Sequence, residues 1–93
     1  MSPNEAVLKV TEILTIIQSM SGRELIPMDG STCPIGDLIG FDSLNAVEAT
    51  VELSSELGFE LPGANMFVSE DGTKARSIAE IAEAVCSILA EGS

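Results

Sequence analysis

Apolar residues recur every three or four positions in three segments of this 93-residue chain, and this helical spacing limits the possible folds more than any other feature. The first segment opens with Ser2-Pro3-Asn4-Glu5, which combines an N-cap, a proline suited to the first helical position and a capping-box glutamate. We expect this helix to stop at Gly22, because glycine readily adopts the backbone that terminates helices. Its apolar positions are Val7, Val10, Ile13, Leu14, Ile17 and Met20.

Two more helices follow from similar end signals. The second is expected over residues 43–57, with Asp42 as its N-cap and Gly58 closing it. The last is expected to begin at Ser77, with a second capping box and with Gly92 past its end. Its capping-box acid is Glu80, and its apolar stripe is Ile78, Ile81, Ala82, Val85 and Leu89.

The connections between these helices are rich in glycine and proline. Residues 23–42 form a long loop, which is uncommon in a compact domain unless the loop packs or functions. Residues 59–62 should be a short extended exit, because the residue before Pro62 avoids the α region. In the ambiguous segment 63–76 we expect one short helical turn near 64–68 and a turn at 69–72. The apolar anchors expected for the long loop are Leu25, Ile26, Ile35, Leu38 and Ile39.

These elements predict an all-α fold. We expect a small antiparallel four-helix bundle, made of three main helices plus a short third helix, with a long loop between helices one and two. The length of 93 residues indicates a single domain over 1–93 with a small core. The hydrophobic fraction of 45% argues against intrinsic disorder. We also expect the chain to be a monomer.

The charge of the chain restricts its partners. Four Lys and Arg residues against 15 Asp and Glu residues give a formal net charge of −11. Such a field repels nucleic acid and anionic membrane surfaces, whereas basic proteins are attracted and steered. The acids fit a purely solubilising role equally well.

We see no signal peptide and no segment that would insert in a membrane, so we expect a cytoplasmic protein.

Several catalytic schemes are excluded by the residues that the chain lacks. Without histidine there is no base for a Ser-His-Asp or Cys-His mechanism and no histidine zinc site. Cys33 and Cys86 are too few for a structural zinc site and are expected to be free thiols in a reducing compartment. Ser69-Glu70-Asp71-Gly72 fails the calcium EF-hand pattern, because Phe67 and Ile78 would occupy two carboxylate positions. We therefore expect that the chain has no catalytic residues and no metal site, and that it is not itself an enzyme.

The helix over residues 43–57 is apolar on two faces. At about 100° per residue, one face is a conventional core stripe, and a second apolar stripe lies nearly opposite. A chain of this size has one core, so the second stripe is covered by the long loop or contacts a partner. The core stripe is Ala46, Ala49, Thr50, Leu53 and Leu57; the second stripe is Leu44, Val47 and Val51, flanked by Glu48, Glu52 and Glu56.

The start of this helix resembles the attachment motif of the acyl carrier protein family. The matching stretch is Gly40-Phe41-Asp42-Ser43-Leu44-Asn45-Ala46-Val47-Glu48, preceded by Ile35-Gly36-Asp37-Leu38-Ile39 and followed at family spacing by Leu57-Gly58-Phe59-Glu60-Leu61-Pro62. Asp-Ser-Leu alone is uninformative, because Asp and Ser are favoured at any helix start. The combination with a long preceding loop in a small acidic helical chain is far more specific.

The resemblance implies that Ser43 carries 4'-phosphopantetheine, transferred from coenzyme A by a separate phosphopantetheinyl transferase with Mg²⁺. It implies that Asp42 assists this encounter and that Leu44 docks the transferase. The thiol of the arm would hold acyl intermediates as thioesters for fatty acid, specialised lipid or polyketide biosynthesis. The expected surface for acyl-loading and acyl-processing enzymes with basic docking patches is Leu44, Val47, Glu48, Val51 and Glu52.

An acyl chain could slip between the helices, because small side chains leave room there; tight alanine packing explains the same residues equally well. The alanines concerned are Ala46, Ala49, Ala79 and Ala82.

Some residues depart from the family pattern. Asn45 stands where a carboxylate is common, and Ser54 and Ser55 replace usual acids. Segment 63–76, which holds Lys74 and Arg76, is several residues longer than usual. These departures favour a specialised carrier. A peptidyl or aminoacyl carrier, and an adaptor that is never modified and only binds proteins, remain as alternatives.

Overall fold

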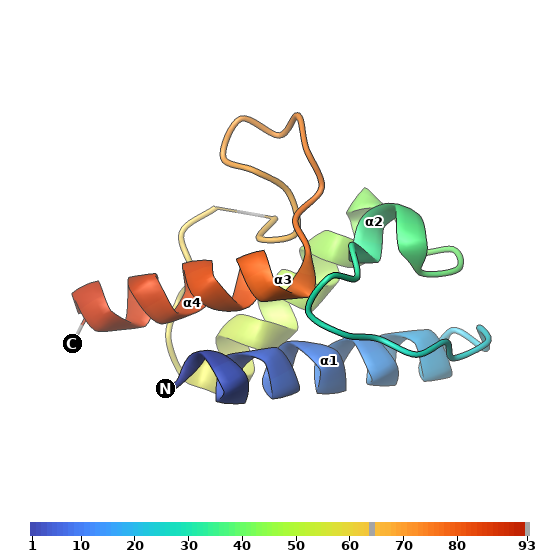
Figure 1. Cartoon of the computed structure of the whole chain (residues 1–93), viewed down its shortest axis with the longest axis horizontal. Coiled ribbons are helices and arrows are strands. Elements are labelled where there is room, and N and C mark those ends of the chain that lie inside the picture. Colours follow the sequence, from blue (N-terminus) through green and yellow to red (C-terminus); the bar gives the residue numbers. More distant parts are fainter. Residues whose placement is uncertain (64, 93) are drawn as a thin grey trace.

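The computed structural model describes residues 1–63 and 65–92, and these residues form a small helical bundle (Figure 1). Its helices are α1 (Pro3–Met20), α2 (Pro34–Asp37), α3 (Ser43–Leu57) and α4 (Ile78–Gly92). Within the described residues, β structure is limited to one isolated antiparallel bridge between Val68 and Ala75. α1 packs against α3 and α4, which both run antiparallel to it (Figure 1). The all-α bundle expected from the sequence is confirmed.

Local capping explains where α1 and α4 begin. Ser2 Oγ accepts a hydrogen bond from the Glu5 N–H at 3.2 Å, and the Ser2 N–H donates to the Glu5 carboxylate at 3.3 Å. The same reciprocal pair joins Ser77 and Glu80, at 3.2 and 2.8 Å. These hydrogen bonds to the ionised carboxylates lower the pKa values of Glu5 and Glu80. Both predicted capping boxes are confirmed.

Glycine explains where two of the helices end. Gly22 follows the Ser21 C-cap of α1 with φ +69°, and Gly58 closes α3 with φ +64°, as expected. The expectation for Gly92 was wrong, since α4 extends through it.

The core draws on both long connections as well as on the helices. Phe41 from the first loop and Phe67 from the second are buried, and their ring centroids are 5.6 Å apart. Aromatic pairs at this separation add to the stabilisation that burial provides. The buried core cluster is Val10, Ile13, Leu14, Leu38, Phe41, Ala46, Ala49, Leu53, Leu61, Met66, Phe67, Ile78, Ile81 and Val85.

The loop over residues 21–42 packs across the bundle, but with fewer anchors than expected. Leu38 is buried, and Ile26 and Ile35 pack against the core. Leu25 and Ile39 are exposed, so their assignment as anchors was wrong. The backbone is extended at Leu38, so its neighbour Ile39 faces the opposite side.

The same loop contains α2, which the sequence pattern did not predict, and it supports the start of α4. The carbonyls of Gly30 and Thr32 accept hydrogen bonds from the Ala79 and Ile78 N–H groups at 2.9 and 2.8 Å. These are first-turn donors that have no partner within their own helix. The loop is thereby fixed between the first helix and the last.

The short helix expected near residues 64–68 does not form in the described part of this segment; Ala64 lies outside it. Asn65 Oδ1 accepts from the Phe67 N–H at 2.9 Å, and this local side-chain bond competes with a helical turn. The expected four helices arise because α2 forms in the first loop instead.

The turn expected at residues 69–72 is confirmed. The Gly72 N–H donates to the Ser69 carbonyl at 2.8 Å, and the Ser69 N–H donates to the Lys74 carbonyl at 2.8 Å. The Asp71 carboxylate accepts from the Ser69 and Thr73 hydroxyls at 2.6 and 2.7 Å. Residues 68–75 therefore form a small hairpin that is stabilised by one carboxylate.

The hydroxyl donors around Asp71 lower its pKa to about 2. Because the pKa of Asp71 is depressed in the folded chain, its contribution to stability is present above the ordinary value of 3.8 and is lost as pH falls towards 2. We predict that a carbon-detected NMR titration will give Asp71 a midpoint near 2, and that the double variant Ser69→Ala, Thr73→Ala will raise it towards 3.8. An unchanged midpoint in that variant would contradict the hydroxyl explanation.

Candidate functional site

The N-terminus of α3 presents a free serine hydroxyl. The Asp42 carboxylate caps the helix by accepting from the Asn45 N–H at 3.0 Å. Since Asp42 supplies the cap, the exposed Ser43 in the first helical position keeps its hydroxyl without a hydrogen-bond partner among the described residues. The helix dipole favours negative charge at this end. The arrangement fits a phosphodiester on the Ser43 oxygen.

The segment before this serine is held by core contacts and by a close backbone approach. Phe41 is buried, and its N–H donates to the Leu38 carbonyl at 3.2 Å. Gly40 has φ +69°, and a Cβ there would lie 2.7 Å from Arg23 Nε. The left-handed backbone therefore favours glycine here, and any side chain at this position would also displace the Arg23 guanidinium.

A polar network links the end of α1 to the start of α3. The Gln18 side chain is 1% exposed, and its amide nitrogen donates to the Ile39 carbonyl at 2.7 Å. Arg23 Nη1 donates to Gln18 Oε1 and to Asn45 Oδ1, each at 3.0 Å. The departure at Asn45 thus supplies a neutral acceptor for Arg23. Sequence reasoning missed Gln18 and Arg23; a glutamine one turn after Leu14 on the apolar stripe was the available signal.

The two-faced character of α3 is confirmed. Its core stripe is buried at Ala46, Ala49, Thr50 and Leu53. On the other side Leu44 is 68% and Val51 is 63% exposed, so the long loop does not cover this stripe. Val47 is half-buried, and Glu48 and Glu52 are exposed. The predicted partner-binding residues therefore lie on one accessible helix face.

The four alanines proposed to make room for an acyl chain do not share one interior surface. Ala46, Ala49 and Ala82 are buried in the bundle, whereas Ala79 is exposed. A Cβ at Gly30 would lie 3.4 Å from the Ala79 Cβ, so Ala79 faces the first loop. Ala46, Ala49 and Ala82 are therefore packed inside the bundle, and Ala79 is not.

Other candidate chemistry is sparse in the described part of the chain. Cys33 and Cys86 are free and partly buried. Residues 1–63 and 65–92 contain no group of three or more Cys, Asp or Glu side chains arranged to hold a metal ion. No helix in these ranges is long and apolar enough to cross a membrane.

Comparison with protein families gives a match whose range includes Ser43. A family model described as a phosphopantetheine attachment site matches residues 11–85, which include all of α2 and α3. The chain belongs to this family. Its carrier domain is the attachment site for covalently bound 4'-phosphopantetheine, and such domains typically carry a group instead of catalysing its chemistry. They interact with phosphopantetheinyl transferases and with the enzymes that process the carried group. Comparisons with curated proteins and with solved structures gave no match.

We predict that Arg23→Ala destabilises the carrier by about 1–3 kcal/mol, because it leaves the buried Gln18 carbonyl without a donor. Urea unfolding followed by circular dichroism measures this change. Arg76→Ala is the matched control, since Arg76 is also half-buried and its Nη1 reaches only the Met66 carbonyl, at 3.5 Å. Equal losses in the two variants would contradict a special role for the Arg23 network.

Proposed function

We propose that this chain is an acyl carrier protein that holds acyl intermediates as thioesters on a 4'-phosphopantetheine arm attached to Ser43 Oγ. The observation that carries the proposal is the division of work between Asp42 and Ser43. Asp42 satisfies the helix N-terminus, which leaves the Ser43 hydroxyl exposed and without a partner among the described residues. The family match over residues 11–85 supports the same assignment.

The chain contributes an acceptor hydroxyl but no base to activate it. It has no histidine, and the neighbouring Asp42 carboxylate caps the helix and makes no hydrogen bond to the Ser43 hydroxyl. A separate transferase then removes the proton while the Ser43 oxygen forms a bond to the phosphorus that carries pantetheine. The pyrophosphate bond of coenzyme A breaks, and adenosine 3',5'-bisphosphate leaves. The bound arm supplies a thiol for thioester formation. In this proposal the chain positions the arm and presents a docking face.

The docking face consists of the exposed stripe of α3 and the acids beside it. Leu44 follows the attachment serine directly and is largely exposed, which suits contact with the transferase. Apolar contact gives affinity, and the carboxylates steer basic partners. The face is Leu44, Val47, Glu48, Val51 and Glu52.

The acidity of the chain favours an acyl group over an aminoacyl or peptidyl group as the cargo. Fatty acid, specialised lipid and polyketide biosynthesis all use such carriers. Loading assays with an acyl-adenylating enzyme and with an aminoacyl-adenylating enzyme separate these cargoes. Thioester formation with the aminoacyl enzyme alone would favour the peptidyl carrier.

Intact mass spectrometry tests the attachment site. We expect incubation with a promiscuous phosphopantetheinyl transferase, coenzyme A and Mg²⁺ to add one phosphopantetheine to the native chain and none to Ser43→Ala. Ser55→Ala, another exposed serine on α3, is the matched control and should be modified like the native chain. If the folded, initially unmodified native chain gains no mass, the unmodified adaptor becomes the better assignment.

Asp42 variants separate the capping role from the role of the charge. Asparagine caps helices as well as aspartate does, so Asp42→Asn should unfold within about 0.5 kcal/mol of the native chain, whereas Asp42→Ala should lose about 1 kcal/mol. If the carboxylate also assists the transferase, Asp42→Asn should lower kcat/KM for modification roughly tenfold, as the loss of one charged contact implies. A native rate in Asp42→Asn would leave Asp42 with a capping role alone.

A further inference from the structure

The structure contains a groove between α1 and α3 that the sequence analysis did not anticipate. Its volume is about 570 Å³. Together the two helices provide an apolar lining with acids along one side. The lining residues are Ile13, Ile16, Ile17 and Met20 from α1 with its C-cap Ser21, and Val47, Glu48, Val51, Glu52 and Glu56 from α3.

Large apolar side chains of both helices are open to solvent in this groove. Met20 is 84% exposed and Ile16 is 48% exposed, and they face the exposed Val51 across it. Residues three to four apart share a helix face, so Ile16 and Met20 form one continuous edge of α1. The accessible apolar stripe of α3 therefore continues onto α1.

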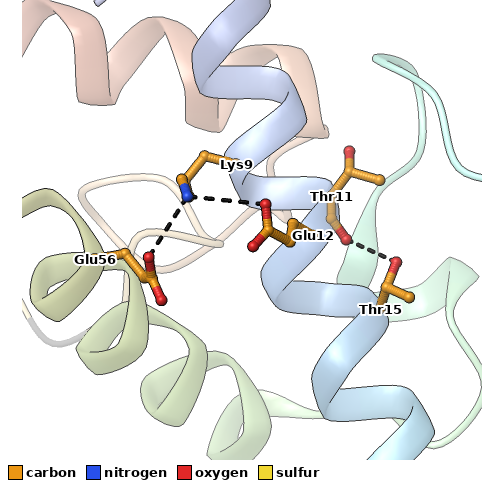
Figure 2. Close-up of polar contacts among 5 residues, drawn as sticks. All are labelled: Lys9, Thr11, Glu12, Thr15 and Glu56. Carbon is orange, nitrogen blue, oxygen red and sulfur yellow. Dashed lines mark hydrogen bonds and ion pairs between the residues drawn. The ribbon is translucent and has the colours of Figure 1, made fainter.

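The charges of the groove are one-sided. The residues that α1 contributes carry no charge, whereas α3 contributes three carboxylates spaced four residues apart. Like charges at this spacing are destabilising in a helix. At one end Lys9 Nζ lies 3.5 Å from the Glu56 carboxylate and joins α1 to α3 (Figure 2). Among the described residues, Glu48 and Glu52 have no ion-pair partner.

The other end of the groove lies near the attachment serine. Met20 and Ser21 end α1, where Arg23 bonds to Asn45 in the first turn of α3. Val47 is about one turn beyond Ser43. A partner segment lying in the groove would therefore run from beside the base of the arm towards Glu56.

We propose that this groove binds an amphipathic helix of a partner protein, with an apolar row between α1 and α3 and lysine or arginine along the edge facing α3. The inference rests on the proposed carrier function and adds α1 to the docking surface. The apolar floor fits the helix-in-groove mode of recognition. The unpaired Glu48 and Glu52 favour a partner helix with basic residues along one edge. Because both acids lie on the α3 side of the groove, that basic edge faces α3.

The test uses the full-length unmodified chain and a synthetic probe peptide. The probe is a helix of about 18 residues, with a leucine row flanked on one side by lysines, long enough to be helical in isolation. Ile16→Lys and Met20→Lys place a cation on the uncharged wall and should weaken binding about tenfold, as loss of a central apolar contact does. Leu8→Lys is the matched control, because Leu8 is 69% exposed on α1, lies outside the groove lining and gives the same charge change. It should change binding less than twofold.

Charge direction is tested by a second pair. Glu52→Gln should weaken the lysine probe, whereas Glu83→Gln, which removes an exposed acid from α4, should not. A probe with glutamates in place of the lysines should not bind. Equal effects of the groove and control variants would show general attraction to an acidic protein and would overturn the proposal.

NMR chemical-shift mapping on the native chain is independent of variant folding. Probe binding should shift Ile16, Met20, Val47 and Val51 and leave Leu8 unchanged. Shifts confined to residues outside the groove would overturn the proposal. So would self-association of the chain in sedimentation experiments together with shifts at the groove residues in the absence of the probe. Mass addition at Ser43 is measured separately, so failure of groove binding is distinguishable from failure of the carrier assignment.

Discussion

The buried side chain of Gln18 organises the end of the molecule that holds the candidate site. A buried primary amide must have its donors and acceptor satisfied, because leaving them unpaired costs stability. Gln18 meets this requirement through Ile39 in the long loop and through Arg23, which also reaches Asn45 in α3. The loop in turn supplies carbonyl acceptors for the first turn of α4. One polar residue on the core face of α1 thus connects to the starts of both other long helices.

The start of α3 shows how one helix end meets two demands. Its backbone donors need an acceptor, and Asp42 provides one. A modifiable hydroxyl must remain uncommitted, and Ser43, one position later, is exposed. A serine at the capping position itself would have its oxygen engaged with the backbone. The order Asp-Ser therefore has a physical reason that the reverse order would lack.

Features with local causes were predictable from the sequence. The bounds of α3 followed from Asp42 and Gly58, and both capping boxes were found where the Ser-x-x-Glu pattern placed them. The two-faced helix followed from periodicity alone. Ser43 was predicted as the attachment residue from the motif and its context, and that assignment stays a prediction.

Features that depend on contacts between distant residues were not predictable in this way. Alternation in extended backbone decides that Leu38 is buried and Ile39 is exposed, and no periodic pattern in the loop reveals that register. The short helix at 64–68 was wrong because Asn65 makes a local bond that competes with it. Arg23 could not be assigned to Asn45, since 22 positions separate them and the packing of α1 on α3 brings them together.

The hairpin over residues 68–75 has a consequence for how the molecule approaches other proteins. Glu70 and Asp71 are offset there by Lys74, and by Arg76 just beyond the hairpin, so residues 68–76 carry no net formal charge in a chain of net charge −11. The hairpin projects from the bundle on the side away from α1 (Figure 1), while Glu48 and Glu52 lie on α3. α3 contains the carboxylates Glu48, Glu52 and Glu56 and no basic residue. A cationic surface is therefore attracted to α3 more strongly than to the hairpin, which adds little net charge to the approach.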